Sequence, residues 1–461
     1  MVIKNIKIIA TLVSLIVTGL LIYSHYYISA LFLVLCFYIL NEVLWADHIR
    51  YNVQEDQLFS FSSAEKLTVY LEKNKLSVPE KFQNGDFTIL LSINLKSNFF
   101  GYIFDPFISI GKDNDSLSNR QYFERGAKGS RYLNISHSFE VGQEQLSLFP
   151  KYCKLTGTKL ELIAFKNPCL KDKKILVMSP HPDDSEIAAY GLYSSNQSMV
   201  VTVTAGESEA DSMFDLTGKE ISPGRIKGEL RVFDSVTVPL WAGLPSRQAI
   251  NLGYFDGTLK EMFENPERSV RSTSANLDNT KVFRSFNKLK LSTDADCKSS
   301  WGNLIRDCSE VISNYRPDII VTPHPELDSH SDHHYTTIAV QKALEESNTS
   351  NIELFYYVNH LKRTDQWPFG PSGSLTGLPP ENSSIDRFFS FSLSREQQVK
   401  KSCALEMMHD LRTSPTPKKY LRILLQEKLI KRKKSYFGSE GFYRRGVKSN
   451  EVFFRTEFKS K

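Results

Sequence analysis

Two segments of the chain, about 140 residues apart, follow the same local plan of apolar strand, polar loop and helix. In the first, the apolar run 174–178 (KILVM) leads into 181–184 (HPDD). In the second, 317–323 (PDIIVTP) leads into the histidine-rich stretch 324–334 (HPELDSHSDHH). Loops that follow neighbouring parallel strands meet in one crevice at the carboxyl edge of the sheet. The chain is therefore predicted to have an α/β fold, with a parallel sheet flanked by helices and a functional site where these loops meet.

The residue types in the two loops indicate a metal site. His181, Asp184 and one histidine of the second loop offer two nitrogens and one carboxylate oxygen, the pattern of a catalytic Zn²⁺ site with an open fourth position. Neither loop contains the cysteine that a structural zinc site would usually use. The alternative is that Asp183, Asp184 and Ser185 only cap the following helix. The histidines of the second loop favour a metal site over simple helix capping.

The sequence around these loops resembles the zinc-dependent de-N-acetylases of PIG-L and LmbE type. Four elements of that family occur in the family's order: HPDD at 181–184, TAGE at 204–207, LGYFD at 252–256 and HSDH at 330–333. The resemblance covers about positions 170 to 340. It implies a Rossmann-like (LmbE-like) fold, Zn²⁺ as cofactor and hydrolysis of an N-acetyl amide.

Carried over residue by residue, the resemblance implies that His181, Asp184 and His333 hold the metal. Zinc lowers the pKa of a bound water to about 7. Asp183 would be the general base that takes a proton from the attacking water and passes it to the leaving nitrogen. His330, supported by Asp332, would donate to the developing oxyanion, a contribution of about 3 kcal/mol.

Two further residues are candidates for substrate binding. Asp256 matches the family element, although an Asp-Gly pair is equally typical of a turn. Arg225 lies four residues before Glu229, whereas the family places its arginine three residues before such a glutamate. His324 and His334 have no counterpart in the family.

Residues 1–46 contain two apolar runs, 8–23 and 28–45, and a membrane span needs about 20 residues. One continuous helix would overshoot a bilayer, so the pattern predicts a transmembrane hairpin, with a cleaved signal peptide as the alternative. Lys4, Lys7 and Arg50 flank the two runs, which predicts an inner-membrane protein whose catalytic domain is cytoplasmic. The six scattered cysteines agree with a reducing compartment.

Two domains are predicted after this anchor. Short strands separated by turn residues over 47–168 indicate a β-rich, β-sandwich-like accessory domain, whose aromatic residues at 99–104 either stack on sugars or belong to its core. Residues 169–461 form the LmbE-like domain. Its segment 364–384, rich in proline, glycine and serine, is predicted to be a substrate lid. The basic run 428–434 is either a solvated helix end or a surface for anionic lipid headgroups.

These features predict a membrane-anchored, zinc-dependent deacetylase. Its substrate would be an N-acetylated amino sugar of GlcNAc type in a lipid-linked or cell-envelope glycan, such as the lipopolysaccharide core. Alternatives are hydrolysis of another N-acyl group, or a non-catalytic, membrane-anchored glycan-binding protein. Nothing in the sequence indicates binding to nucleic acid.

Overall fold

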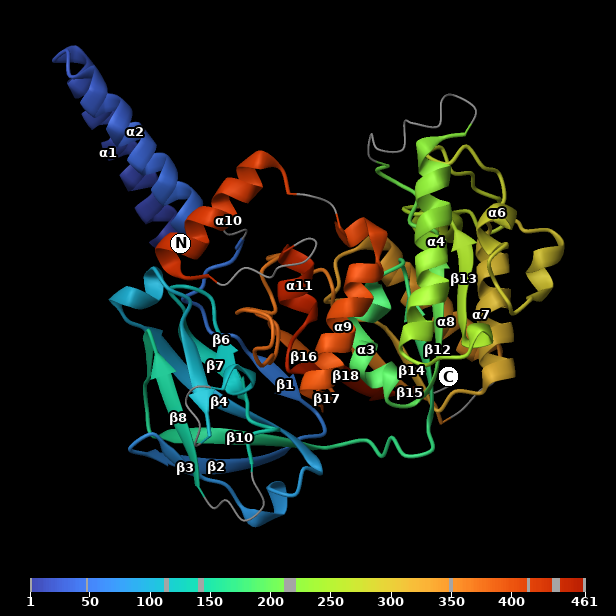
Figure 1. Ribbon diagram of the computed structural model, residues 1–461. Helices are drawn as coiled ribbons and strands as arrows, with labels where there is room; N and C mark the ends of the chain where they lie inside the picture. Colours follow the sequence, from blue (N-terminus) through green and yellow to red (C-terminus); the bar gives the residue numbers. More distant parts are fainter. Residues whose placement is uncertain are drawn as a thin grey trace.

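The computed structural model describes residues 2–46, 49–111, 116–139, 145–210, 221–347, 351–412, 415–432 and 440–458. Figure 1 shows three parts: a projecting pair of N-terminal helices, a β-rich domain beneath them, and an α/β domain beside it.

The α/β domain is built on a seven-stranded sheet of order β13-β12-β11-β14-β15-β18-β17. The first five strands are parallel, and β18 runs antiparallel to both β15 and β17. The strands are β11 (Lys174–Ser179), β12 (Gln197–Thr204), β13 (Ala249–Tyr254), β14 (Ile319–Pro323), β15 (Glu353–Tyr357), β17 (Arg387–Ser392) and β18 (Asn450–Glu457). The predicted parallel sheet is confirmed.

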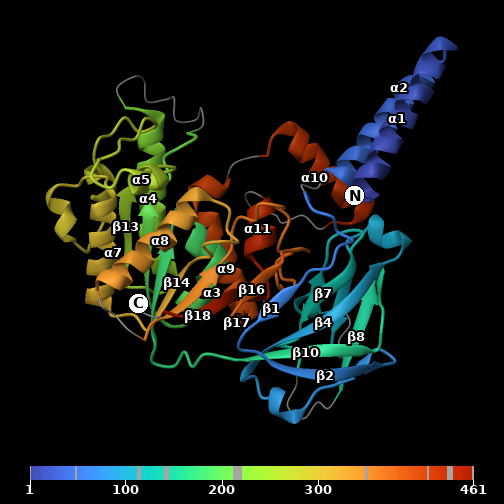
Figure 2. The same cartoon turned by 180° about the vertical axis from the view of Figure 1, so that it is seen from behind.

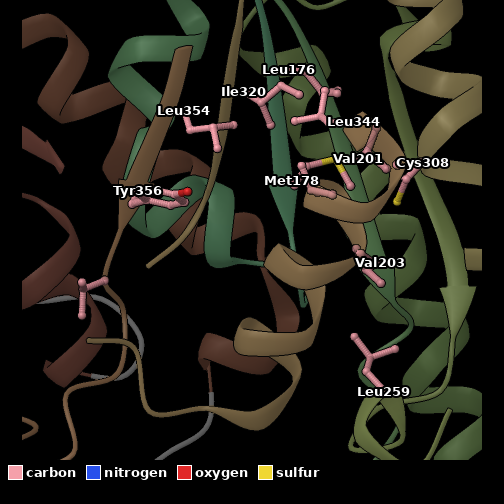
Figure 3. Close-up of a cluster of buried hydrophobic side chains, with 14 of the residues drawn as sticks. Leu176, Met178, Val201, Val203, Leu259, Cys308, Ile320, Leu344, Leu354 and Tyr356 are labelled. Atoms are coloured by element: carbon pink, nitrogen blue, oxygen red, sulfur yellow. The ribbon is translucent and has the colours of Figure 1, made fainter. Parts of the chain in front are cut away.

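Helices cover both faces of this sheet. The helices after the N-terminal pair are α3 (Asp184–Ser194), α4 (Pro223–Trp241), α5 (Leu259–Glu264), α6 (Lys281–Arg284), α7 (Trp301–Tyr315), α8 (Ser331–Glu346), α9 (Arg395–Met407), α10 (Pro417–Ile430) and α11 (Glu440–Gly446). Of these, α10 does not cover the sheet but lies beside the N-terminal pair (Figure 1). On one face, Leu176 and Met178 of β11 pack in a core with Cys308 of α7 and Leu344 of α8 (Figure 3). On the other face, alternate strand residues pack against α3 and α9. Both faces of the strands are apolar because both are buried.

The order of the strands sets the position of the site. β12 lies on one side of β11 and β14 on the other, so Ile175 pairs with Ser198 and also with Ile319. The loops that follow β11 and β14 therefore leave the same edge of the sheet side by side, at a topological switch point.

The β-rich domain contains a single nine-stranded sheet, all of whose pairings are antiparallel. Its strands are β2 (Glu65–Glu72), β3 (Lys75–Ser77), β4 (Phe87–Ser97), β5 (Phe107–Ile110), β6 (Arg120–Tyr122), β7 (Lys128–Asn134), β8 (Gln145–Lys151), β9 (Cys153–Leu155) and β10 (Lys159–Lys166). Strands from opposite ends of the sheet share one core, for example Ile108 of β5 with Leu133 of β7. The domain is thus β-rich as predicted, but it is one sheet folded over on itself rather than two stacked sheets.

Short 3-10 turns connect these elements. They are η2 (Glu80–Phe82), η3 (Phe99–Tyr102), η4 (Leu117–Asn119), η6 (Ser246–Gln248), η7 (Ser292–Ala295) and η8 (His409–Arg412).

The two domains are joined by shared packing and pairing. β1 (Phe59–Phe61) pairs in parallel with β16 (Ser383–Ile385), although more than 300 positions separate them. Phe59, Phe61 and Phe165 belong to the same hydrophobic core as Phe388 of the α/β domain. The β-rich domain is therefore packed as an integral part of the molecule.

The segment 364–384 is not a lid, contrary to the prediction from its composition. Leu375 and Leu378 are buried, and the backbone N–H of Leu375 donates to the carbonyl of Arg120 in the β-rich domain. The buried Lys448 ammonium holds the same segment through the carbonyls of Phe369 and Gly370. This segment connects the two domains.

The N-terminal helices α1 (Val2–Tyr23) and α2 (Tyr27–Leu40) pack against each other as a hairpin, and α2 continues into one π-helical turn, η1 (Asn41–Trp45). The hairpin projects from the body (Figures 1 and 2). Its apolar side chains face outward, and Ala30 is the one residue of α2 that is buried. Among the described helices, Tyr27–Trp45 alone is long and apolar enough to cross a membrane, while the apolar helix Lys7–Tyr23 is shorter.

Candidate active site

Three potential ligand atoms converge at the switch point. His181 follows β11, Asp184 begins α3, and His333 lies in the first turn of α8. Asp184 Oδ2 lies 3.2 Å from His181 Nδ1 and 3.0 Å from His333 Nε2, and the two nitrogens are 3.3 Å apart. Three ligands, each about 2 Å from one ion, lie at about such separations from one another. We call these three atoms the ligand triangle.

Each member of the ligand triangle is held by a second polar group. His181 Nε2 faces Asp256 at 3.2 Å and Asp332 at 3.3 Å, so it carries the ring proton and Nδ1 presents a lone pair. His333 Nδ1 lies 3.1 Å from Asp328 Oδ2. Carboxylates behind metal-binding histidines, which fix the ring orientation, are typical of metal sites.

Asp184 is held in the same way. Its Oδ1 accepts a hydrogen bond of 2.8 Å from the Asn359 amide, and its Oδ2 accepts one of 2.9 Å from the backbone N–H of His181. Both carboxylate oxygens are thereby oriented before any ligand arrives, which favours a predetermined coordination geometry.

The electrostatics of the cluster favour a cation at its centre. Burial works against ionisation of Asp184, yet His333 and His181 hold its pKa well below the usual range. Burial also opposes the charging of His333, but Asp184 and Asp328 raise its pKa to about 10. The pKa of His181 is likewise raised well above its usual value by Asp184, Asp256 and Asp332, against the effect of burial. Several buried carboxylates thus attract positive charge to this point, and two imidazoles and a carboxylate suit a divalent metal.

The described residues form three overlapping groups of potential ligands, all sharing members of this cluster. They are His181, His330 and His333; Asp184, His333 and His360; and His181, Asp256 and Asp332. In the ligand triangle all three mutual distances are 3.3 Å or less, and an oriented second group lies behind each member, so this triangle is the candidate metal site.

Asp183 lies beside the ligand triangle in a strained backbone conformation. Its φ is +121°, a value that residues with a side chain rarely adopt, and such strain is concentrated at functional sites. Although it precedes α3, its side chain makes no capping hydrogen bond. Burial raises its pKa to about 8, against the attraction of Arg231, whose guanidinium lies 3.5 Å away, and with the support of Asp184. Helix capping therefore does not account for Asp183.

His330 and Asp332 are both in the cluster, but they are not paired as expected. The Asp332 side chain is fully buried, faces His181, and accepts a 2.7 Å hydrogen bond from the backbone N–H of Gly257. His330 is only partly buried, and its Nδ1 has no hydrogen-bond partner in the described part of the chain. Burial and the rings of His181 and His333 lower the pKa of His330, so the ring is neutral near pH 7. Asp332 positions His181, and His330 is the histidine that can face a substrate.

The structure places the two candidate substrate residues differently. Asp256 reaches the cluster, 3.2 Å from His181, and its backbone N–H donates to the buried Glu207, whose pKa burial raises to about 7. The half-exposed Arg225 instead pairs with Glu229 at 2.9 Å, and no described contact links it to the cluster. The arginine of α4 that does reach the cluster is Arg231, which is buried between Asp183 and Asp410.

Four residues of the site were missed in the sequence: Glu207, Arg231, Asp328 and His360. His360 follows β15, the next parallel strand, and its ring centroid lies 4.9 Å from that of His333. A predicted strand followed by Asn359 and His360 is a signal that could have identified it. His324 and His334, left without a role, hold the loop itself: His324 Nδ1 accepts from the backbone of Glu326, and His334 contacts the Pro325 carbonyl.

The fold and the cluster define an α/β protein with a candidate metal-dependent catalytic centre at the carboxyl edge of its sheet. Residues 176–344 match the PIG-L family model, described as GlcNAc-PI de-N-acetylase, and form a domain of that family. This domain is that of a hydrolase acting on an N-acetyl amide. The whole chain matches no curated protein.

Several solved structures align with the chain at low similarity. The zinc-inhibited form of teicoplanin deacetylase Orf2 is 16% identical over 62% of this chain and 100% of that chain, with a TM-score of 0.35. The conserved protein TT1542 from Thermus thermophilus is 18% identical over 63% and 96%, with a TM-score of 0.31. GalB, the 4-carboxy-2-hydroxymuconate hydratase from Pseudomonas putida, is 14% identical over 63% and 98%, with a TM-score of 0.31.

Proposed function

We propose that the protein is a zinc-dependent deacetylase that removes the acetyl group from an N-acetylated amino sugar of GlcNAc type in a lipid-linked or cell-envelope glycan. The observation that carries this proposal is the ligand triangle of His181, Asp184 and His333 with the unligated carboxylate of Asp183 beside it. A protein that only bound a glycan would have no need for this carboxylate at the metal.

Zinc, when held by the ligand triangle, supplies Lewis acidity that activates water and polarises the amide carbonyl. Asp183 holds and moves the proton: burial has raised its pKa towards neutrality, which suits a group that must take up a proton and then release it to the departing amine. The positive charge of Arg231 opposes that rise in pKa. A cation at the ligand triangle would lower the pKa of Asp183 further.

His330 is the candidate donor to the carbonyl oxygen of the substrate. Burial and the neighbouring rings lower the pKa of His330, which favours a neutral imidazole that donates through one ring N–H. Asp256 belongs to the wall of the same cluster and can accept a hydrogen bond from a sugar hydroxyl, in addition to facing His181.

The membrane assignment is part of the proposal. An outward-facing apolar hairpin in water would expose many large apolar side chains, among them Ile28 and Leu31, which are 86% and 71% exposed. Burial in the inner membrane would remove this cost, and a hairpin leaves the catalytic domain on the cytoplasmic side, where the flanking lysines and Arg50 favour it. Protease accessibility of the C-terminus in intact and in opened cells tests the orientation; digestion in intact cells would contradict it.

The activity is tested with the full-length chain in detergent. We expect about one zinc per chain and release of acetate from N-acetylglucosaminyl lipids, with both lost after chelation and restored by Zn²⁺. Release of a longer acid from an N-acyl analogue, without acetate release, would show that the enzyme hydrolyses a different N-acyl group. Absence of both zinc and acid release across the panel would favour the glycan-binding alternative.

A further inference from the structure

A cavity of about 770 Å³ lies apart from the ligand triangle. It is enclosed by the β-rich domain, α10 and the chain that follows the hairpin. Its wall includes Ala46 and Ile49 next to the hairpin, Lys151 and Tyr152 of the β-rich domain, and Lys419 of α10. No step of the proposed reaction uses it.

This cavity is strongly basic. Ten lysine and arginine side chains line it, against three carboxylates. The whole chain has an excess of only five positive charges, so the lining concentrates more positive charge than the molecule carries as a whole. Clefts of one sign focus their field and raise the local concentration of opposite charge.

Two of the three carboxylates in the wall are already paired with arginines. Asp105 accepts two hydrogen bonds from Arg432, at 2.7 and 2.9 Å, and Glu124 is buried in an ion pair with Arg131. Lys151 and Lys419 contact no carboxylate in the described part of the chain, and both are exposed to the cavity solvent. The uncompensated positive charge of these two lysines favours the binding of an anion.

The wall also offers flat aromatic surfaces. Phe104 and Tyr152 stack with ring centroids 5.0 Å apart, and the Lys151 ammonium lies 5.6 Å from the ring centroid of Tyr152. Amphipathic rings beside cationic side chains are suited to a ligand that has both a charged group and a carbon skeleton.

The cavity lies where the hairpin joins the body. Arg125, in its wall, donates to the carbonyls of Val43 and Leu44 at 3.0 and 3.1 Å, and Arg422 of α10 donates to the buried Glu42 at 2.6 Å. Figure 1 shows α10 beside the base of the hairpin.

Exposed apolar side chains lie on α10, next to the base of the hairpin. On α10, Tyr420 and Leu429 are 46% and 53% exposed. An amphipathic helix with basic residues, next to a membrane hairpin, has the composition of an interfacial helix. The cavity beneath it would therefore lie at the depth of lipid headgroups.

We infer that this basic cavity binds the anionic, phosphate-bearing headgroup of a membrane lipid, in preference to a zwitterionic one. Lysine and arginine provide the charge-assisted hydrogen bonds that phosphate oxygens accept, and the aromatic wall contacts the attached carbon skeleton. A free phosphate ion has the same charged chemistry but neither the carbon skeleton nor the tether to the membrane.

Binding is tested by calorimetry with the full-length protein in a neutral detergent. The probes are dihexanoyl phosphatidic acid, dihexanoyl phosphatidylcholine and inorganic phosphate. We expect phosphatidic acid to bind at least roughly tenfold more tightly than either of the others. The double variant Lys151→Gln/Lys419→Gln should weaken phosphatidic acid binding about tenfold or more, since each lysine near a headgroup contributes about 1 kcal/mol.

The matched control is Lys154→Gln/Lys428→Gln, which removes two exposed lysines outside the cavity wall, one from the nearby strand β9 and one from α10. It should leave binding within about twofold of the parent, because exposed lysines outside the cavity add little to it. Equal binding by the cavity variant and the parent would overturn the inference. So would equal affinity for phosphatidic acid and phosphatidylcholine, or for phosphatidic acid and free phosphate.

This inference rests on the membrane assignment in the proposed function, but the headgroup site and the activity are decided by different measurements. No acetate release from any substrate would refute the proposed function, while the calorimetry would still decide the headgroup site.

Discussion

At the scale of single residues, the ligand triangle depends on groups that do not belong to it. Asp328 illustrates this, because its Oδ2 lies 3.1 Å from His333 Nδ1 and also accepts the backbone N–H of Asn359 at 2.8 Å. It orients the ring whose other nitrogen completes the triangle.

We expect Asp328→Asn to weaken zinc binding roughly 10- to 100-fold, the usual effect of removing a carboxylate behind a metal-binding histidine. Competition with a chromophoric chelator measures the affinity. Asp278→Asn, at a side chain that is 78% exposed, is the control and should bind zinc like the parent. Unchanged zinc affinity in Asp328→Asn would show that Asp328 stabilises the loop backbone and does not support the metal site.

Asp183→Asn separates proton transfer from metal binding. Asparagine tolerates a positive φ better than most residues and has the same size, so the fold and the zinc content should persist. Acetate release should fall about 10²- to 10⁴-fold, because the amide cannot carry the proton. Zinc by elemental analysis and acetate by a coupled assay are measured on the same sample. Near-normal turnover would remove Asp183 from the mechanism.

The sequence predicted the ligands carried by the loops after β11 and β14. It missed Arg231, which tertiary structure brings to Asp183, and also His360, whose position after β15 could have indicated it. His181, Asp184 and His333 were identifiable because β11 and β14 carry their loops to one edge of the sheet. Arg231 was not, since it lies six positions beyond Arg225 on α4 and so about 240° around the helix. Nothing local to the sequence says which face of α4 points to Asp183.

At the scale of elements, α10 shows how a segment gains a role from a distant partner. Its Arg422 donates to Glu42, 380 positions earlier. The predicted basic run 428–434 begins in the last turn of this helix, and its residues 433 and 434 lie outside the described part of the chain. The segment 364–384 is comparable: its composition is that of a loop, and its burial comes from strands of another domain. Such long-range contacts leave no periodic pattern in the local sequence.

Glu42→Gln should loosen α10. The Glu42 side chain is 2% exposed and faces Arg422, which is 24% exposed, so water can partly replace the lost carboxylate. We expect a local cost of about 1–2 kcal/mol, below the roughly 3–5 kcal/mol of breaking a fully buried pair. Hydrogen exchange of the amides in 417–430 should accelerate about tenfold. Glu396→Gln, which removes an exposed helical pair with Lys400, should leave exchange in its own helix nearly unchanged.

At the scale of the whole molecule, the two sheets are not independent. The core that contains Leu176 and Ile320 of the seven-stranded sheet also contains Phe59, Phe61 and Phe165 of the β-rich domain. Asn134 of β7 donates to Ser390 of β17 at 2.9 Å, and Asn450 of β18 donates to the same hydroxyl. The composition of 47–168 predicted a β-rich region, but a boundary drawn from composition cannot reveal a core shared across it.

Two truncations test whether the α/β domain needs the hairpin and the β-rich domain for its stability. The hairpin buries almost nothing of itself against the body, so the chain 41–461 should keep a single cooperative thermal transition close to that of the full-length protein. The chain 169–461 loses three buried phenylalanines of the shared core, each contributing about 3 kcal/mol, against a total stability of about 5–15 kcal/mol for a typical protein. It should therefore melt without a cooperative transition, bind a dye specific for exposed apolar surface, and lose zinc. Calorimetry and dye binding on both truncations measure this difference. If the chain 169–461 unfolded cooperatively at the same temperature as the chain 41–461, the α/β domain would fold without the β-rich one.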